Sequence, residues 1–306
     1  MTVQKPLLAI IGPTASGKSA LAMAIARKCA GEILSIDSMQ IYKGMDIGTA
    51  KPSEQERKDV PHHLIDVALP DELFSAARFV ELADAVIAQR KNPLVATGGT
   101  PMYFKALFEG LFEGPGADEP LRNRLRALSG AELHDRLRQV DAAAAERIHA
   151  GDSKRLVRAL EVYELTGKPI SILQKQWESN QSMRIPAVWI GLAWEREELN
   201  RRINARVKAM IAEGWVDEVR GLLARYPNLS KTAAEATGYA ELIEFANSPI
   251  GGRIDLDEAV EQIKIATRQL ARRQMKWFRR FRNVHWLDGR EPVERNAERA
   301  IGLWGQ

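Results

Sequence analysis

The sequence predicts an α/β fold: a doubly wound parallel sheet with an inserted all-helical lobe and a basic helix near the C-terminus. Short apolar runs alternate with segments of helical spacing in the first hundred residues, and this alternation resumes after residue 186. A Gly- and Pro-rich stretch at 110–120 interrupts it. The segment that follows, 121–149, is charged, rich in alanine and without strand candidates, which is typical of helices.

The strand candidates are short apolar runs, and the helix candidates have apolar residues at intervals of three and four. We predict strands at 7–11, 32–36, 93–97, 187–193 and 284–287. We predict helices from Lys18 onward and at 79–89, 199–223 and 257–281. Ligands of a doubly wound sheet bind at the carboxyl ends of its strands, so the residues that directly follow each strand are site candidates.

The pattern divides the chain into two domains. Residues 1–115 together with about 186–306 form the predicted sheet domain, and about 116–185 form the helical insertion lobe. The proportions of hydrophobic residues, 45%, and charged residues, 27%, are those of a globular protein. No apolar run approaches the roughly 20 residues of a membrane span.

Cysteine usage indicates the compartment. Cys29 is the only cysteine, which excludes an intramolecular disulfide and a cysteine-rich zinc site. We therefore expect a reducing, cytoplasmic setting and no membrane association.

A phosphate-binding motif follows the first strand. Residues 12–19 fit G-x-x-x-x-G-K-[ST] between a strand and a helix, the context that this motif requires. Its backbone N–H groups converge on a phosphate, Lys18 adds a positive charge, and Ser19 is a candidate ligand of Mg²⁺. The candidate phosphate-binding residues are Gly12, Pro13, Thr14, Ala15, Ser16, Gly17, Lys18 and Ser19. The motif does not distinguish ATP from another diphosphate.

Three further residues are candidates for chemistry. Asp37 follows the second strand and is either a general base beside the bound phosphate or a helix N-cap. Thr100 follows Gly98 and Gly99 after the third strand, where a ligand can approach the backbone or the chain simply turns. Arg206 is either a clamp on leaving-group charge or a solvated arginine.

The third strand ends without a carboxylate. Motor-type ATPases usually place a magnesium-directed Asp or Glu at this position. No Asp or Glu follows the strand at 93–97 here, which argues against simple nucleotide hydrolysis.

The late helix carries a cluster of positive charge. Between Lys264 and Arg282 there are eight basic and no acidic residues. Arg268, Arg272, Lys276 and Arg280 recur every four residues and form one face, which favours contacts with nucleic-acid phosphates. The residues that we expect in the core are Ile263, Ala266, Leu270, Trp277 and Phe281.

Longer motifs carry a family resemblance from Gly12 to about Trp286. The chain resembles bacterial tRNA dimethylallyltransferases, the tRNA isopentenyltransferase family. The most specific segment is 37–52, D-S-M-Q-I-Y-K-G-M-D-I-G-T-A-K-P. The others are 12–19, P-H-H-L-I-D at 61–66, G-G-T at 98–100, R-A-L-E-V at 158–162 and Q-L-A-R-R-Q at 269–274.

The resemblance implies transfer of a dimethylallyl group from dimethylallyl diphosphate to the adenosine 3′-adjacent to the anticodon of tRNA. It implies that Asp37 is the base, that Thr100 and Arg122 lie near the adenine, and that Arg206 binds diphosphate. The implied partner is the tRNA anticodon stem-loop, Mg²⁺ is the expected cofactor, and a monomer suffices. The implied tRNA-binding residues are Asp37, Ser38, Met39, Gln40, Thr100, Arg122, Lys154, Arg155, Leu156, Val157, Arg158, Gly238, Tyr239, Arg272, Arg273, Lys276, Trp277 and Arg279.

Two positions depart from the family pattern. Pro101 stands where glycine is common, and Ala240 stands where a basic residue is common. The first puts the geometry of the loop in question, and the second removes one expected phosphate contact.

Two other functions fit part of the pattern. A P-loop kinase of a small-molecule hydroxyl also places an Asp after its second strand, but it has little need of the basic helix. A non-catalytic, nucleic-acid-binding ATP switch would use that helix without forming a covalent product. Neither accounts for the long match with the tRNA dimethylallyltransferases.

Overall fold

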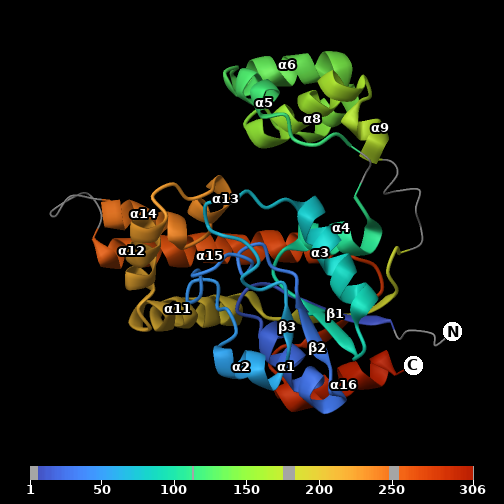
Figure 1. Cartoon of the computed structure of the whole chain (residues 1–306), viewed down its shortest axis with the longest axis vertical. Helices are drawn as coiled ribbons and strands as arrows, with labels where there is room; N and C mark the ends of the chain where they lie inside the picture. The colour runs from blue at the N-terminus through green and yellow to red at the C-terminus, as the bar shows by residue number, and fades with distance from the viewer. Residues whose placement is uncertain (1–5, 112–113, 175–182, 248–254, 306) are drawn as a thin grey trace. The chain divides into compact units, whose positions relative to one another are not determined.

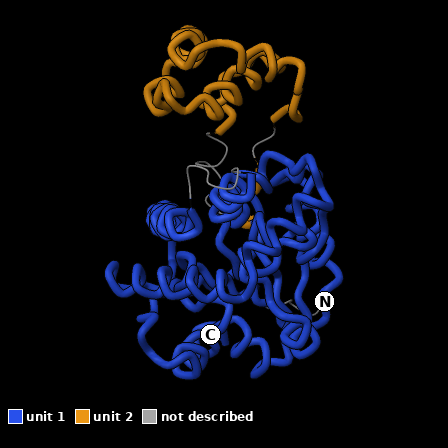
Figure 2. Tube along the Cα trace, turned by 90° about the vertical axis from the view of Figure 1, so that its left-hand side faces the viewer, with its two compact units in different colours: residues 1–107, 185–306 blue, residues 108–184 orange. Residues whose placement is uncertain are grey.

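The computed structural model of the chain describes residues 6–111, 114–174, 183–247 and 255–305. The chain divides into two compact units (Figures 1 and 2). Unit 1 comprises residues 1–107 and 185–306, and unit 2 comprises residues 108–184. The first boundary precedes the one predicted at 115, and residues 112 and 113 of the Gly- and Pro-rich stretch lie outside the described residues. No helix among the described residues has the length and apolarity needed to cross a membrane.

Unit 1 is built on a six-stranded parallel sheet, which confirms the predicted fold class. The strand order is β3-β2-β4-β1-β5-β6. The strands are β1 (Leu7–Ile11), β2 (Glu32–Ser35), β3 (His62–His63), β4 (Leu94–Thr97), β5 (Ala187–Ala193) and β6 (Val284–Asp288). The five predicted strands agree with these bounds to within one residue at each end. Strand β3 was not predicted, because two residues are too few to show a periodic pattern.

Helices cover both faces of this sheet (Figure 1). Because side chains alternate along a strand, Leu8 and Ile10 of β1 point to one face, where α1 (Lys18–Cys29) and α16 (Val293–Trp304) pack. On the other face, Phe104 of α4 (Pro101–Glu109) lies 5.9 Å from Trp189 of β5, centroid to centroid. Phe278 of α15 (Leu256–Phe278) lies 5.9 Å from Phe104, edge to face.

The predicted helix at 199–223 is in fact two helices. The chain forms α11 (Arg196–Ala212) and α12 (Trp215–Arg225). Gly214 between them has φ +99°, a left-handed conformation that glycine adopts readily and that ends the first helix. Apolar periodicity on both sides of this residue concealed the break. The other helices of unit 1 are α2 (Glu54–Asp59), α3 (Ala76–Gln89), α13 (Lys231–Ala234) and α14 (Tyr239–Asn247).

The predicted core face of α15 is also wrong in part. Ile263 is buried as expected, but the other buried residues include Ala271, Gln274 and Phe278. Ala266, Leu270, Trp277 and Phe281 are only partly buried. The helix is rotated relative to the prediction because a small residue and a polar one, Ala271 and Gln274, face the interior.

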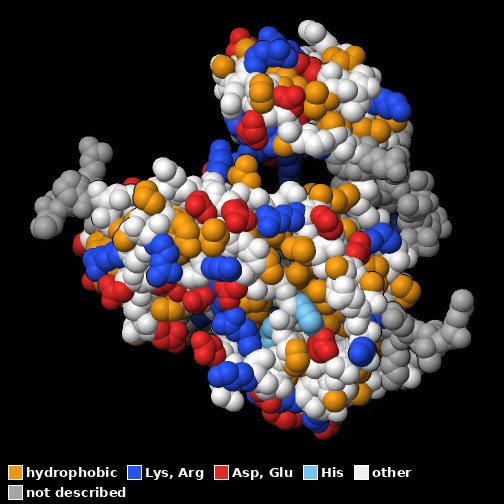
Figure 3. Space-filling view, viewed as in Figure 1, with side chains coloured by type: hydrophobic (Ala, Val, Ile, Leu, Met, Phe, Trp, Pro, Cys, Tyr) orange, Lys and Arg blue, Asp and Glu red, His pale blue; other side chains and the backbone are white. Residues whose placement is uncertain are grey.

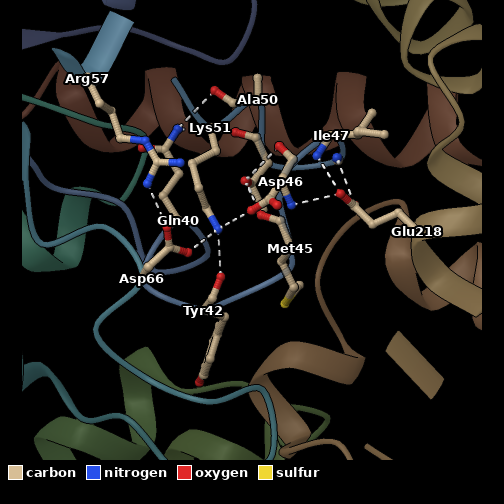
Figure 4. A network of polar contacts seen from close by, with 12 residues as sticks. Gln40, Tyr42, Met45, Asp46, Ile47, Ala50, Lys51, Arg57, Asp66 and Glu218 are labelled. Carbon is tan, nitrogen blue, oxygen red and sulfur yellow. Dashed lines mark hydrogen bonds and ion pairs between the residues drawn. The ribbon is translucent and has the colours of Figure 1, made fainter. Parts of the chain in front are cut away.

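Polar contacts fix the long connection from β2 to β3 (Figure 4). The Gln40 side-chain amide donates to the carbonyl oxygens of Thr49 and Ala50, both at 3.2 Å. The Lys51 ammonium is 1% exposed; it donates to the Tyr42 carbonyl at 2.8 Å and pairs with Asp66 at 2.7 Å. Hydrogen bonds within the motif at 37–52 and the ion pair with Asp66 thus hold this connection in one conformation.

Glu218 of α12 holds the same connection from outside. Its carboxylate accepts hydrogen bonds from the backbone N–H groups of Asp46, Ile47 and Gly48 at 2.9, 2.7 and 3.3 Å. It also accepts from the Tyr239 hydroxyl at 2.6 Å. One carboxylate thus satisfies four donors and ties α12 and α14 to the connection.

Unit 2 consists of helices around its own apolar core. The helices that lie within its described residues are α5 (Glu119–Arg126), α6 (Gly130–Val140), α7 (Ala142–Arg147), α8 (Ser153–Thr166) and α9 (Ile170–Gln174). The core includes Leu125, Leu133, Leu137, Leu156 and Leu160.

A buried carboxylate organises one side of unit 2. Glu161 accepts from Arg122 Nε at 2.8 Å and Nη2 at 3.0 Å, from Arg158 at 2.5 Å, and from the Asp118 N–H at 2.8 Å. Burial raises the pKa of Glu161, but these hydrogen bonds outweigh burial and hold that pKa below its usual range. The two arginines lie side by side because they share this carboxylate.

We expect Glu218→Ala to lower the free energy of unfolding by about 2 kcal/mol, because it removes a charged acceptor from several donors at once. Urea denaturation measures the change. Asp217→Ala is the matched control: Asp217 is the adjacent residue, its side chain is 82% exposed, and its ion pair with Arg220 is a surface pair. Equal destabilisation by the two variants would contradict the role assigned to Glu218.

We expect Glu161→Ala to destabilise unit 2 by about 3–5 kcal/mol, since it leaves two arginines without their buried partner. The depressed pKa of Glu161 also fixes the direction of the pH dependence. Its stabilising contribution is complete above the unfolded-state pKa of about 4.3 and is lost as the pH falls through the lower folded-state pKa.

Urea denaturation at neutral and acidic pH measures both effects. Glu164→Ala is the control, because Glu164 lies on the same helix but pairs with Arg124 at the surface. A wild-type protein that lost no more stability in acid than the Glu161→Ala variant would contradict the interpretation.

Candidate active site

The predicted phosphate-binding loop, residues 12–19, forms tight turns between β1 and α1. Ala15 and Gly17 have left-handed φ values of +62° and +90°, and Gly17 directly precedes α1. The Ser16 N–H donates to the Pro13 carbonyl at 3.2 Å, and Lys18 Nζ donates to the same carbonyl at 3.4 Å. These turns open a cavity of about 420 Å³ lined by Ala15, Gly17, Lys18, Ser19, Ala20, Arg202, Ala205 and Arg206.

Three cations line this cavity. Burial and the neighbouring Arg206 charge lower the pKa of Lys18 to about 8, against the opposing effect of the Asp37 carboxylate. Burial likewise lowers the pKa of Arg206, again opposed by Asp37. The cations therefore repel one another in a partly desolvated space, and a bound anion would relieve that repulsion.

Arg202 is a member of the site that the sequence prediction missed. Its Nε donates to the Ala15 carbonyl at 2.9 Å, and its guanidinium lies over the Trp194 ring, 4.2 Å from the centroid. Trp194 Nε1 donates to the Ser16 carbonyl at 2.9 Å. The spacing of Arg202 and Arg206 could have revealed it, because residues four apart share one face of a helix.

Asp37 is held at the end of β2. Its Oδ1 accepts from the Met39 N–H at 2.9 Å, and its Oδ2 accepts from the Gly99 N–H at 3.3 Å. Residues 38–41 form a turn, so Asp37 is not a helix N-cap. The carboxylate instead bridges the loop after β2 and the loop after β4.

Thr100 joins the same two loops. Its Oγ1 accepts from the Ser38 N–H at 2.9 Å and donates to the Ser38 hydroxyl at 3.1 Å. Pro101 is the first residue of α4. This position suits proline, because the first turn of a helix does not need its N–H and the ring fixes a helical φ. The proline therefore fits the loop geometry.

Gln274 was also missed as a site residue. Its side chain reaches from α15 to the Thr14 N–H, from which Oε1 accepts at 2.8 Å. Its Nε2 donates to the Gly99 carbonyl at 2.6 Å. The sequence places this glutamine in a basic, exposed-looking helix, and only tertiary packing shows that it is buried.

The candidate contacts with nucleic acid separate into exposed and buried groups. Arg272, Arg273, Lys276 and Arg279 are exposed on α15, and Trp277 is half-buried beneath Arg280. Lys154 and Arg155 are exposed at the start of α8 in unit 2. On the face drawn in Figure 3, Lys and Arg side chains alternate with acidic ones.

Several of the predicted nucleic-acid contacts have side chains that are buried or bonded to other groups of the chain. Leu156 and Val157 are buried in the core of unit 2. Tyr239 is 1% exposed with its hydroxyl on Glu218, and both polar atoms of the Gln40 amide bond within the chain. Arg122 and Arg158 are engaged with Glu161. Burial or internal hydrogen bonding occupies the side chains of Leu156, Val157, Tyr239 and Gln40, and contact of these four positions with nucleic acid stays a prediction.

Comparison with known proteins shows the family to which this chain belongs. The family model described as IPP transferase matches residues 40–281. The tRNA dimethylallyltransferase of Symbiobacterium thermophilum is 48% identical over 299 residues, 95% of this chain and 92% of that protein. The tRNA dimethylallyltransferase of Acetivibrio thermocellus is 43% identical, and the match covers 98% of each chain.

Solved structures give the same result. The tRNA isopentenylpyrophosphate transferase of Bacillus halodurans matches with a TM-score of 0.70 and 36% identity, over 99% of this chain and 97% of that one. A eukaryotic dimethylallyltransferase acting on tRNA matches with a TM-score of 0.79 and 25% identity, over 97% and 78%. This chain therefore belongs to the IPP transferase family of tRNA-modifying enzymes.

Proposed function

We propose that this protein transfers a dimethylallyl group from dimethylallyl diphosphate to the exocyclic amine of the adenosine 3′-adjacent to the anticodon, and releases pyrophosphate. One observation carries the proposal: a cationic cavity of about 420 Å³ and an oriented carboxylate lie at the same end of one sheet. The relatives' names supply the substrate class. The alternative kinase is not favoured by any of them.

The donor's diphosphate fits the cavity. In the transfer step the allylic C–O bond breaks, and its electron pair leaves with pyrophosphate. Lys18, Arg202 and Arg206 surround the space in which this negative charge grows. Fixed cations in a water-poor site stabilise such charge more effectively than water does.

Asp37 acts as the base on the acceptor. As the bond between the adenine nitrogen and the allylic carbon forms, the amine proton passes to the carboxylate. The N–H groups of Met39 and Gly99 orient that carboxylate. Oδ1 accepts from the Met39 and Gln40 N–H groups at 2.9 and 3.4 Å, whereas Oδ2 accepts from the Gly99 N–H. A carboxylate oxygen has two lone pairs, so Oδ2 can also accept a hydrogen bond from the adenine amine.

Mg²⁺ fits the donor set, with Ser19 as its protein ligand. Ser19 is exposed and lines the cavity beside Lys18. In the described part of the chain, no group of three or more His, Cys, Asp or Glu side chains is placed to hold a metal. A single hydroxyl together with diphosphate oxygens and water is a usual Mg²⁺ environment. When bound, the ion would neutralise part of the diphosphate charge.

The tRNA anticodon stem-loop is the proposed macromolecular partner. The exposed basic residues of α15 are suited to its phosphates, as are Lys154 and Arg155 in unit 2. Thr100 and Arg122 remain the proposed contacts near the adenine. The anticodon loop is single-stranded, so the base can leave its stack at a cost of roughly a few kcal/mol. We propose that the protein is a cytoplasmic monomer. We also propose that it makes one phosphate contact fewer than its relatives, because Ala240 stands where a basic residue is common.

We expect Asp37→Asn to slow transfer about 10²–10⁴-fold, because the amide cannot take the amine proton. The measurement is incorporation of labelled dimethylallyl diphosphate into unmodified tRNA, with Mg²⁺ and without ATP. The Kd for tRNA should stay within about twofold, since the variant keeps the size of the side chain. Asp71→Asn, an exposed aspartate outside the site, is the control.

Two results would contradict these assignments. Near-wild-type transfer by Asp37→Asn would remove Asp37 as the base. Absence of transfer by the wild-type protein across a full tRNA pool, with ATP-dependent phosphorylation of a small molecule, would favour the kinase.

We expect diphosphate affinity to fall as the pH rises above about 8, the pKa of Lys18. Lys18 is charged below that pH and neutral above it, so the cavity loses a cation as the proton leaves. Calorimetric titration with pyrophosphate between pH 6.5 and 9.5 measures the effect. Lys18→Arg stays charged throughout, and the ratio of the two affinities cancels the titration of pyrophosphate itself. A ratio independent of pH would contradict the lowered pKa.

A further inference from the structure

We propose that Gln274 is a positioning residue that couples the tRNA-binding helix α15 to both halves of the reaction centre. This inference rests on the proposed function and deepens it. Three parts of the site meet at this one side chain: the phosphate loop, the loop that follows β4, and, through that loop, Asp37.

The hydrogen bonds form a continuous path. The Thr14 N–H donates to Gln274 Oε1 at 2.8 Å, and Gln274 Nε2 donates to the Gly99 carbonyl at 2.6 Å. The Gly99 N–H then donates to Asp37 Oδ2 at 3.3 Å. A single amide therefore fixes the donor loop and the base relative to each other, although they are far apart in sequence.

Packing leaves this side chain little freedom. Gln274 is 6% exposed, and both of its functional atoms are paired. A Cβ atom on Gly99 would lie 2.9 Å from Gln274 Nε2 and 3.1 Å from Asp37 Oδ2. The missing side chain of Gly99 is thus what lets the glutamine and the aspartate converge on the same loop.

The neighbours of Gln274 in the helix connect this path to the proposed tRNA surface. Arg273 and Lys276 flank it in sequence and are exposed. Three residues before it, Ala271 packs against Ala15 of the phosphate loop. The turn of α15 that carries Arg273 and Lys276 also carries Gln274, which bonds to Thr14 and Gly99. Binding of tRNA phosphates to these two cations therefore acts on the turn that holds both loops.

The test compares Gln274→Met with wild type in single-turnover transfer. Methionine has a similar length but neither a strong donor nor a strong acceptor, so Thr14 and Gly99 lose their shared partner. We expect the rate constant per active site to fall about 10²-fold, the scale expected of a misplaced reactive group, and the donor KM to rise. The tRNA Kd should remain within twofold, because the exposed cations are unchanged. Gln269→Met, at an exposed position on the same helix, should match wild type.

A second variant separates the two bonds. Gln274→Glu keeps an acceptor for the Thr14 N–H but replaces the amide group that donates to the Gly99 carbonyl by a carboxyl oxygen. We expect its donor KM to lie near the wild-type value while its transfer rate constant stays low. A donor KM as high as that of Gln274→Met would overturn the assignment of the Thr14 bond.

The outcomes distinguish this inference from a merely structural role and from failure of the proposed function. A normal rate constant with a smaller active fraction would make Gln274 only a stabilising residue and would overturn the inference. Absence of transfer by the wild-type protein would instead refute the proposed function. In that case the pyrophosphate affinity of Gln274→Met tests the contact between Gln274 and the phosphate loop. An affinity equal to that of wild type would refute the role of this contact.

Discussion

The parallel pairing of β1 with β4, and of β4 with β2, is the constraint on which the site depends. In this register Ile10 lies opposite Thr97, and Ser35 lies opposite Thr97 on the other side. Because all three strands end at one level, the loops that follow them emerge at one edge of the sheet. The phosphate loop, Asp37 and Thr100 are therefore brought together by backbone hydrogen bonds, before any side chain of the site makes a contact.

The charged side chains at this edge of the sheet include three cations that face one cavity and one carboxylate beside them. Lys18, Arg202 and Arg206 face one space, and the electrostatic effect of Asp37 on the first and last is opposite to the effect of burial. A diphosphate would satisfy the cations and leave the aspartate available on its own side. The N–H groups of Met39, Gln40 and Gly99 hold the Asp37 carboxylate in one orientation at the end of β2.

The sequence predicted the sheet and the position of the turn between β1 and α1 well because both follow from local patterns. Apolar runs located five strands, and G-x-x-x-x-G-K-[ST] located the loop. The break at Gly214 escaped prediction, since a left-handed glycine depends on tertiary geometry as much as on composition. Gln274 and Glu161 escaped for a related reason: a polar residue on a polar helix gives no sign that it is buried. Their partners, Thr14 and Arg122, lie 260 and 39 residues away along the chain.

Helix α15 carries a buried set and an exposed set of residues on the same turns. Ala271, Gln274 and Phe278 recur at intervals of three and four residues and point inward, toward the phosphate loop, Gly99 and Phe104 respectively. Arg272, Arg273, Lys276 and Arg279 occupy the turns between them and point to solvent. The helical period separates the two sets, so affinity for a polyanion can change through the outer set without disturbing the donor site. Substitutions in the inner set would disturb the site, because the packing of Phe278 on Phe104 sets the distance between α15 and the sheet. That distance determines whether the Gln274 side chain can contact Thr14 and Gly99.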